Sequence, residues 1–262
     1  MSTSEHRIEA GSQFPIGVCE PASALNGRTS HRATATVLRE LSTATGPNVL
    51  LVHGLASSSD MNWVATRWVK SLATVGFHVW SVDLPAHGMA GPAPLATRAS
   101  LCEEIIGHAR SISPDPIPAV GYSLGAQLVY QCAAREPRCF SCVILGGFSM
   151  VDRLSEVLGT PGFLVDPAQR RLAERLASDP FSPDTSPDQP VLLFSGADDA
   201  WSTPGDHAAF LARRRRPDGT GPPTELHLEP GRDHVNVVTS RRVRETALRF
   251  LAGRTPNVSH AR

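Results

Sequence analysis

The sequence has no excess of charge of either sign. Its 262 residues include 25 Lys and Arg and 25 Asp and Glu, so the formal net charge is zero. A neutral chain has no long-range field that would gather nucleic acid or an anionic membrane surface, and neither is expected as a partner. One basic run, Arg213–Arg216, has no interleaved aromatic residues. It is interpreted as the C-terminal end of a helix, where positive charge is favourable.

Long hydrophobic runs are also missing. The longest, such as Val49–Val52, are far shorter than the about 20 residues that a membrane-spanning helix needs. The first residues, Met1–Arg7, contain no apolar segment of the kind found in secretory signal peptides. We therefore expect a soluble, cytoplasmic protein with no membrane partner. The abundance of Ala, Arg and Pro is typical of bacterial genomes rich in G and C.

Cysteine is scarce and odd in number, with residues at 19, 102, 132, 139 and 142. Such a set makes a poor disulfide framework. Cys139 and Cys142 have the C-x-x-C spacing of redox and zinc sites, but no second pair completes a zinc site, and Cys142 begins an apolar run. The pair is therefore interpreted as structural. The sequence predicts neither a metal nor another cofactor.

Short apolar runs alternate with longer segments whose apolar residues recur at helical spacing. Strands are expected over 48–52, 77–82, 117–121, 142–145, 191–195 and 226–228. Helices are expected over 62–74, 98–112, 124–135 and 238–251. Short strands separated by helices predict an α/β fold with a mostly parallel central sheet flanked by helices. Residues 14–20 and 33–41 alternate in polarity and predict antiparallel edge strands.

Residues 149–190 are longer than a simple connection between two strands. They combine a helical pattern around 168–177 with a Pro-rich stretch over 179–190, for which a plain surface loop is the alternative. Long insertions in such folds often form lids or pocket walls. We expect a single domain over residues 1–262, with 149–190 as a small helical cap or lid within it.

The stretch "IPAVGYSLGAQLVYQ", residues 117–131, places a serine between two glycines where a strand meets a helix. G-x-S-x-G in this context is typical of a nucleophile at a sharp, strained turn. Side chains two positions before or after the serine would collide there, which explains Gly121 and Gly125. The alternative, that Ser123 only caps the helix, does not account for both glycines. We therefore predict Ser123 as a nucleophile.

A serine nucleophile needs a base, and the base needs an orienting acid. At a turn of this kind the acid and then the histidine follow the serine along the chain. Asp198 and Asp199 come directly after a predicted strand, and His234 lies between the last predicted strand and the last helix. Both loops leave the edge of the sheet at which Ser123 sits. The three elements together predict a catalytic triad.

Two backbone N–H groups are expected to form an oxyanion hole. One belongs to Leu124, directly after the nucleophile, and the other to Leu55 in the loop that follows the strand over 48–52. His53 and His87 are interpreted as bracing the loops beside Gly54 and Gly88 rather than as catalytic groups.

These residues resemble the α/β-hydrolase family. The matching motifs are "VHGLASS" at 52–58, "DLPAHG" at 83–88, "GYSLG" at 121–125, "GADD" at 196–199 and "PGRDH" at 230–234. The resemblance covers residues 33 to 252 and implies the fold and a Ser-His-Asp triad, but says little about the substrate. In the family the acid commonly follows a glycine by three positions, which favours Asp199; Asp198 and Asp152 stay open. Ala86 departs from the family, which usually has glycine in that turn.

Large apolar side chains neighbour the catalytic loops and the insertion. The candidates for the substrate pocket are Trp63, Phe148, Met150 and Trp201, together with Met61 and Phe163. Core packing is the alternative for each of them. An apolar pocket would favour an uncharged acyl group of moderate size.

The sequence thus predicts a serine hydrolase that cleaves an ester or thioester of a small acyl substrate through an acyl-enzyme. Two alternatives stay open: a lyase, cyclase or acyltransferase that uses the same triad, because a fold does not fix a function, and a non-catalytic ligand receptor. The oligomeric state also stays open, with a homodimer as one alternative.

Overall fold

The computed structural model describes residues 35–255, and the strand predicted over 14–20 lies outside them. Seven strands form one sheet in the order β1-β3-β2-β4-β5-β6-β7. They span Val37–Glu40 (β1), Asn48–Val52 (β2), His78–Asp83 (β3), Ile117–Tyr122 (β4), Phe140–Gly146 (β5), Val191–Gly196 (β6) and Thr224–Glu229 (β7). β1 pairs antiparallel with β3, and all other neighbours are parallel. The predicted fold class is confirmed.

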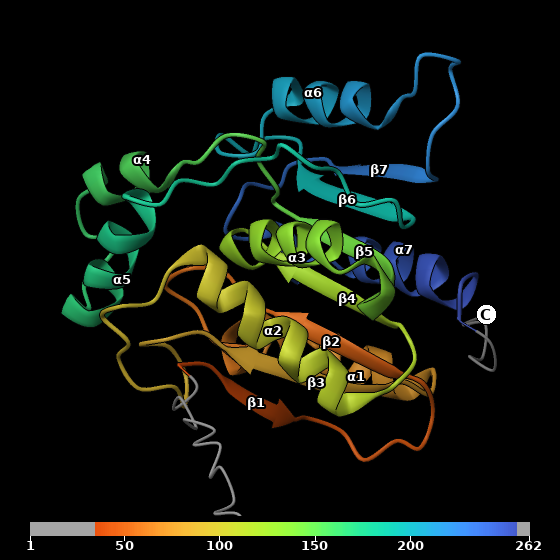
Figure 1. Cartoon of the computed structure of the whole chain (residues 1–262), viewed down its shortest axis with the longest axis horizontal. Helices are drawn as coiled ribbons and strands as arrows, with labels where there is room; N and C mark the ends of the chain where they lie inside the picture. The colour runs from red at the N-terminus through yellow and green to blue at the C-terminus, as the bar shows by residue number, and fades with distance from the viewer. Residues whose placement is uncertain (1–34, 256–262) are drawn as a thin grey trace, which may run out of the picture. The chain divides into compact units, whose positions relative to one another are not determined.

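Helices cover both faces of this sheet (Figure 1). The longer ones span Trp68–Thr74 (α1), Arg98–Ile112 (α2), Leu124–Arg135 (α3), Leu154–Gly159 (α4), Pro167–Ala177 (α5), Pro204–Arg214 (α6) and Arg241–Ala252 (α7), with single turns at Asp60–Val64 (η1), Pro137–Cys139 (η2) and Val237–Thr239 (η3). α1 and α7 pack on one face, and α2, α3 and α6 on the other. Because both faces are covered, the central strands are continuous apolar runs.

The basic run at 213–216 begins in the last turn of α6, as the sequence suggested. Arg214 is buried, and its guanidinium donates to the carbonyl oxygens of Pro187 and Gln189. This arginine therefore holds the chain just before β6 and is unavailable to a nucleic acid.

The segment between β5 and β6 carries α4 and α5, which stand apart from the layered helices in Figure 1. Its apolar cluster of Val157, Leu164 and Ala173 packs against Leu55 and Trp201. The insertion therefore rests on the loops that leave β2 and β6.

Asp152 and Asp179, which flank α4 and α5 within the insertion, both contact Arg98 at the start of α2. The guanidinium of Arg98 lies 2.6 Å from Asp152 Oδ2, and its Nε donates to the carbonyl oxygen of Asp179 at 3.1 Å. The backbone N–H of Arg98 donates to the Asp179 carboxylate at 3.0 Å. Arg98 is only 2% exposed, and a buried charge of this kind is tolerated only when it is paired.

Within residues 35–255, no helix is both long and apolar enough to cross a membrane.

Candidate active site

Ser123 sits at the turn between β4 and α3 with φ 53° and ψ −116°, a conformation that costs energy for any residue with a side chain. The glycines two positions away make the turn sterically feasible. A Cβ atom on Gly121 would lie 2.4 Å from the Gly125 carbonyl oxygen, and one on Gly125 would lie 2.2 Å from the Val52 carbonyl oxygen. The backbone N–H of Ser123 donates to Gly146 at 2.8 Å and fixes the turn against β5.

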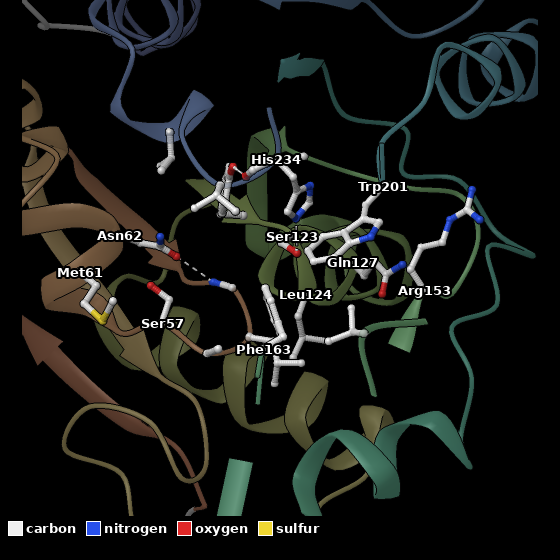
Figure 2. A pocket seen from close by; sticks show the side chains of 18 of the residues that line it. Ser57, Met61, Asn62, Ser123, Leu124, Gln127, Arg153, Phe163, Trp201 and His234 are labelled. Atoms are coloured by element: carbon white, nitrogen blue, oxygen red, sulfur yellow. Dashed lines mark hydrogen bonds between the residues drawn. The ribbon is translucent and has the colours of Figure 1, made fainter. Parts of the chain in front are cut away.

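The structure brings Ser123, His234 and Asp199 into one hydrogen-bonded line, although they lie far apart in the sequence. Figure 2 shows His234 beside Ser123. Ser123 Oγ and His234 Nε2 are 2.9 Å apart. His234 Nδ1 is 2.9 Å from Asp199 Oδ2 and 3.1 Å from Oδ1. A carboxylate can only accept from Nδ1–H, so Nε2 is left to accept the serine hydroxyl proton.

Asp199 is 4% exposed and is held in its charged form. Burial alone would raise its pKa, but hydrogen bonds and charge from His234, with the N–H groups of Ser202 and Trp201, bring the pKa below its usual value. Those N–H groups donate to Oδ1 at 2.8 and 2.9 Å, and the Ser195 hydroxyl donates to Oδ2 at 3.1 Å. Multiple donors to an anionic carboxylate favour ionisation.

The two other carboxylates that the sequence left open lie elsewhere. Asp198 is exposed, and only its backbone takes part in the turn, donating to Arg232 at 2.9 Å. Asp152 is paired with Arg98 at 2.6 Å and also accepts the backbone N–H of Phe181 at 2.7 Å. Of the three, Asp199 is the carboxylate in contact with His234.

The loop that carries His234 is held by aromatic side chains. The hydroxyl of Tyr122, directly before Ser123, donates to the carbonyl oxygen of His234. Tyr122 in turn stacks on Phe194 at 6.0 Å between ring centroids. The Trp201 ring approaches the imidazole edge-on at 4.9 Å. Tyr122 thus couples the position of the imidazole to that of the serine.

Two side chains hold the backbone on either side of Leu55. Asn62 Oδ1 accepts the Gly54 N–H at 2.9 Å (Figure 2), and His87 Nε2 accepts the Ala56 N–H at 3.0 Å. The N–H of Leu55 between them has no acceptor within residues 35–255, and neither has the N–H of Leu124. Both of these donors line the same cavity as Ser123.

The sequence did not lead us to predict a role for Asn62 at the site. The signal was a polar residue between two large apolar residues, Met61 and Trp63. It projects from η1, a π-helical turn in which the Ala65 N–H bonds back to Asp60 at 2.8 Å. π-Helical turns are frequent at functional sites.

His53 and His87 brace loops, as the sequence suggested. His53 donates from Nδ1 to the Gly54 carbonyl oxygen at 2.7 Å and accepts the Leu84 N–H at 3.0 Å. Complete burial lowers its pKa to about 4. Burial also lowers the pKa of His87. Both rings are therefore neutral near pH 7, which lets Nε2 act as an acceptor. Ala86 has φ 62°, so the departure from glycine in this turn costs on the order of 1 kcal/mol.

A cavity of about 370 Å³ opens at Ser123 between these loops and the insertion. Met61, Phe163 and Trp201 line it, together with Leu124 and the α4 residues Leu154 and Val157. Its wall is mainly apolar, and Gln127 and Arg153 contribute the polar groups on the side below Trp201 (Figure 2).

Three predicted pocket residues lie in the core instead, and these predictions were wrong. Trp63 is fully buried and packs edge-on against Trp68 at 5.6 Å. Phe148 is 1% exposed and stacks on Tyr130 at 5.2 Å. Met150 is partly buried and packs against the same core. Each has a neighbour in the chain that faces the cavity, namely Met61 and Asn62 for Trp63, and Gly147 and Ser149 for Phe148 and Met150.

Residues 35–255 contain no group of three His, Cys, Asp or Glu side chains placed to hold a metal ion. Cys142 lies inside β5, where burial raises the pKa of its thiol to about 12. A thiol with so high a pKa is unreactive, in agreement with a structural interpretation of the C-x-x-C pair.

Parts of this chain are similar in sequence to known proteins. A profile described as "Alpha/beta hydrolase family" matches residues 49–260. A pimeloyl-[acyl-carrier protein] methyl ester esterase of Nitrosospira multiformis is 36% identical over 103 residues, 38% of this chain and 38% of that protein. Its counterpart in Methylococcus capsulatus is 30% identical over 122 residues, 47% of this chain and 41% of that protein. The matches thus span about two fifths of these relatives.

Among solved structures, a carboxylesterase of Nitrososphaera gargenis superposes with a TM-score of 0.63 at 17% identity, covering 83% of this chain and 94% of that one. At this identity the likeness bears on the fold alone.

Proposed function

The chain belongs to the alpha/beta hydrolase family, and we propose that it is a carboxylic ester hydrolase in which Ser123, His234 and Asp199 form the catalytic triad. One observation carries the proposal. Two contacts of 2.9 Å join the serine hydroxyl, the imidazole and the carboxylate in the order that nucleophilic catalysis needs.

In the proposed mechanism His234 Nε2 takes the proton of Ser123 as its oxygen attacks the ester carbonyl carbon. Asp199 holds the imidazole with Nε2 toward the serine and stabilises the imidazolium. His234 then gives the proton to the leaving alcohol, and an acyl-enzyme remains. Water, activated by the same imidazole, releases the free acid and restores Ser123.

The N–H groups of Leu55 and Leu124 are proposed to bind the oxyanion. Preorganised donors of this kind usually supply the largest share of the catalytic effect. Their lack of acceptors within the described part of the chain supports this role. Asn62 and His87 accept hydrogen bonds from the N–H groups of Gly54 and Ala56, on either side of Leu55. These bonds keep the Leu55 N–H from rotating away from the cavity.

The insertion over 149–190 is proposed as a lid on this site. Leu154, Val157 and Phe163 line the cavity, and the cluster to which Val157 belongs rests on Leu55. The substrate is proposed to be a small acyl ester. A thioester is the alternative substrate class, to be compared with esters by experiment. The apolar cavity wall and the relatives named as methyl ester esterases support an ester.

The test combines active-site labelling with turnover. A fluorophosphonate should label the wild type and not Ser123→Ala, and Ser123→Ala should lose hydrolysis of p-nitrophenyl esters by about 10⁴-fold or more. Free acid should be released from simple esters, and an acyl-chain series of esters and thioesters compares the two classes. Near-full activity of Ser123→Ala refutes the mechanism. Labelling without release of free acid indicates a transferase or lyase.

A further inference from the structure

Gln127 lies in α3, four residues after Ser123. Its side chain is polar and lines the same cavity as Ser123. Residues separated by four lie on one helical face, with Cβ atoms about 5–6 Å apart. Gln127 is 7% exposed, so it is more than nine-tenths buried, and it lines the cavity together with Ser123. Figure 2 shows it below Trp201, between Ser123 and Arg153.

The orientation of the Gln127 amide is fixed by its neighbours. Its Nε2 donates to the carbonyl oxygen of Ser149 at 3.2 Å and to that of Val151 at 3.3 Å. Both partners are acceptors, so the amide nitrogen must face them and the amide oxygen must face the other way. No donor within residues 35–255 meets that oxygen. Gln127 thus presents a fixed acceptor with an open lone pair.

Two other polar side chains of the cavity lining, Ser149 and Arg153, already contact carboxylates, although the buried Nε of Arg153 has no hydrogen-bond partner within residues 35–255. The Ser149 hydroxyl donates to Asp206 at 2.8 Å. The guanidinium of Arg153 is 2.9 Å from Glu156 and 3.6 Å from Asp206, and it points away from Ser123 in Figure 2. With two carboxylates against one guanidinium, the surroundings do not favour an anionic substrate group.

The side of the cavity that contains Gln127 suits the acyl part of the substrate. His234 must protonate the leaving oxygen, so the leaving group lies against His234 and its neighbour Val235. The rest of the lining includes the apolar residues Leu124, Leu154 and Phe163, together with Gln127, Ser149 and Arg153.

From this arrangement, and resting on the proposed hydrolase function, we infer that Gln127 selects acyl groups with an uncharged hydrogen-bond donor. The donor is a hydroxyl or an amide N–H a few bonds from the ester carbonyl. A plain alkyl chain would displace water from the amide oxygen and leave it without a partner. Leaving a buried acceptor unpaired is costly, and sites built around a hydrogen bond discriminate strongly against analogues that lack it.

The experiment uses the full chain and two matched pairs of p-nitrophenyl esters. The 3-hydroxyhexanoate is compared with the hexanoate, and N-acetylglycinate with 4-oxopentanoate, in which a methylene replaces the N–H. Each kcat/KM is divided by the rate of uncatalysed hydrolysis of the same ester. The wild type should favour the donor-bearing member by about 10-fold or more in at least one pair.

Gln127→Met, similar in shape but without the acceptor, should bring that ratio to about one and raise activity on the plain ester. Gln131→Met, the same change one turn further along α3 and outside the cavity lining, should leave the ratio unchanged. Fluorophosphonate labelling shows whether each variant keeps an intact site. If Gln127→Met does not fold, the preference of the wild type for the donor-bearing ester in each pair decides whether the inference holds.

Failure of this inference and failure of the proposed function look different. Ratios near one in both pairs, in a wild type that is labelled and cleaves the plain esters, overturn the role of Gln127 alone. A ratio that persists in Gln127→Met does the same. A wild type that cleaves none of the esters overturns both.

Discussion

Replacing Asn62 by Leu tests whether the backbone at Leu55 is held for catalysis. The substitution keeps much of the side-chain volume but removes the oxygen that accepts the Gly54 N–H at 2.9 Å. A single oxyanion donor is worth about 10²–10³ in kcat, which sets the upper limit for the loss. Because the His87 clamp on the other side remains, we expect kcat to fall by about 10-fold with KM little changed.

Steady-state hydrolysis of a short p-nitrophenyl ester separates the two parameters. The free energy of unfolding should also fall by about 1–3 kcal/mol, because a buried N–H loses its partner. The matched control is Ser58→Ala, which removes a hydrogen bond of 3.2 Å to the Met61 N–H in the same turn without touching Gly54. If Asn62→Leu keeps the wild-type kcat, or if Ser58→Ala loses as much, Asn62 does not position the oxyanion hole.

Two further predictions concern groups around the triad. Tyr122→Phe keeps the stack on Phe194 but loses the hydroxyl that bonds the His234 carbonyl. Both kcat and the fluorophosphonate labelling rate should fall by about 3- to 10-fold. An unchanged labelling rate would argue against coupling between the positions of His234 and Ser123. The pKa of His53 is about 4 in the fold against an ordinary 6.5, so below 6.5 the unfolded chain binds a proton that the folded chain does not. Stability should therefore decline by on the order of 3 kcal/mol as the pH falls through this window. Urea unfolding of the wild type and His53→Gln should show a flatter pH dependence in the variant, and equal slopes would contradict the reasoning.

Much of the fold was predictable because its signals are local. A strand, a G-x-S-x-G turn and a helix follow one another within residues 117–135, and each step has its own sequence pattern. The loops carrying Asp199 and His234 follow strands in the same way. Parallel strands end at a common edge, so order along the chain sufficed to predict that these loops meet.

The lining of the cavity was less predictable, because nearness in sequence does not say which way a side chain faces. Successive residues in a helix point about 100° apart. Met61 and Trp63 therefore diverge within η1, and the tryptophan enters the core while the methionine faces the cavity. Trp201, which follows Asp199 in the loop itself, does line the cavity.

The supporting hydrogen bonds could not be read from the sequence at all. Asn62 and His87 reach the backbone beside Leu55 from two different segments. Gln127 looks like an ordinary polar residue of an amphipathic helix until the carbonyl groups of Ser149 and Val151 are placed against it. Such contacts depend on tertiary structure, for which no local pattern exists.

The attachment of Asp152 and Asp179 to Arg98 suits the segment between them, which carries α4 and α5, for exchange as a unit. A chimaera that exchanges the residues between Asp152 and Asp179 keeps both anchoring carboxylates and leaves the strands and the triad loops as they are. The exchange would replace cavity-lining residues such as Leu154 and Val157, while Ser123, Asp199 and His234 stay as they are.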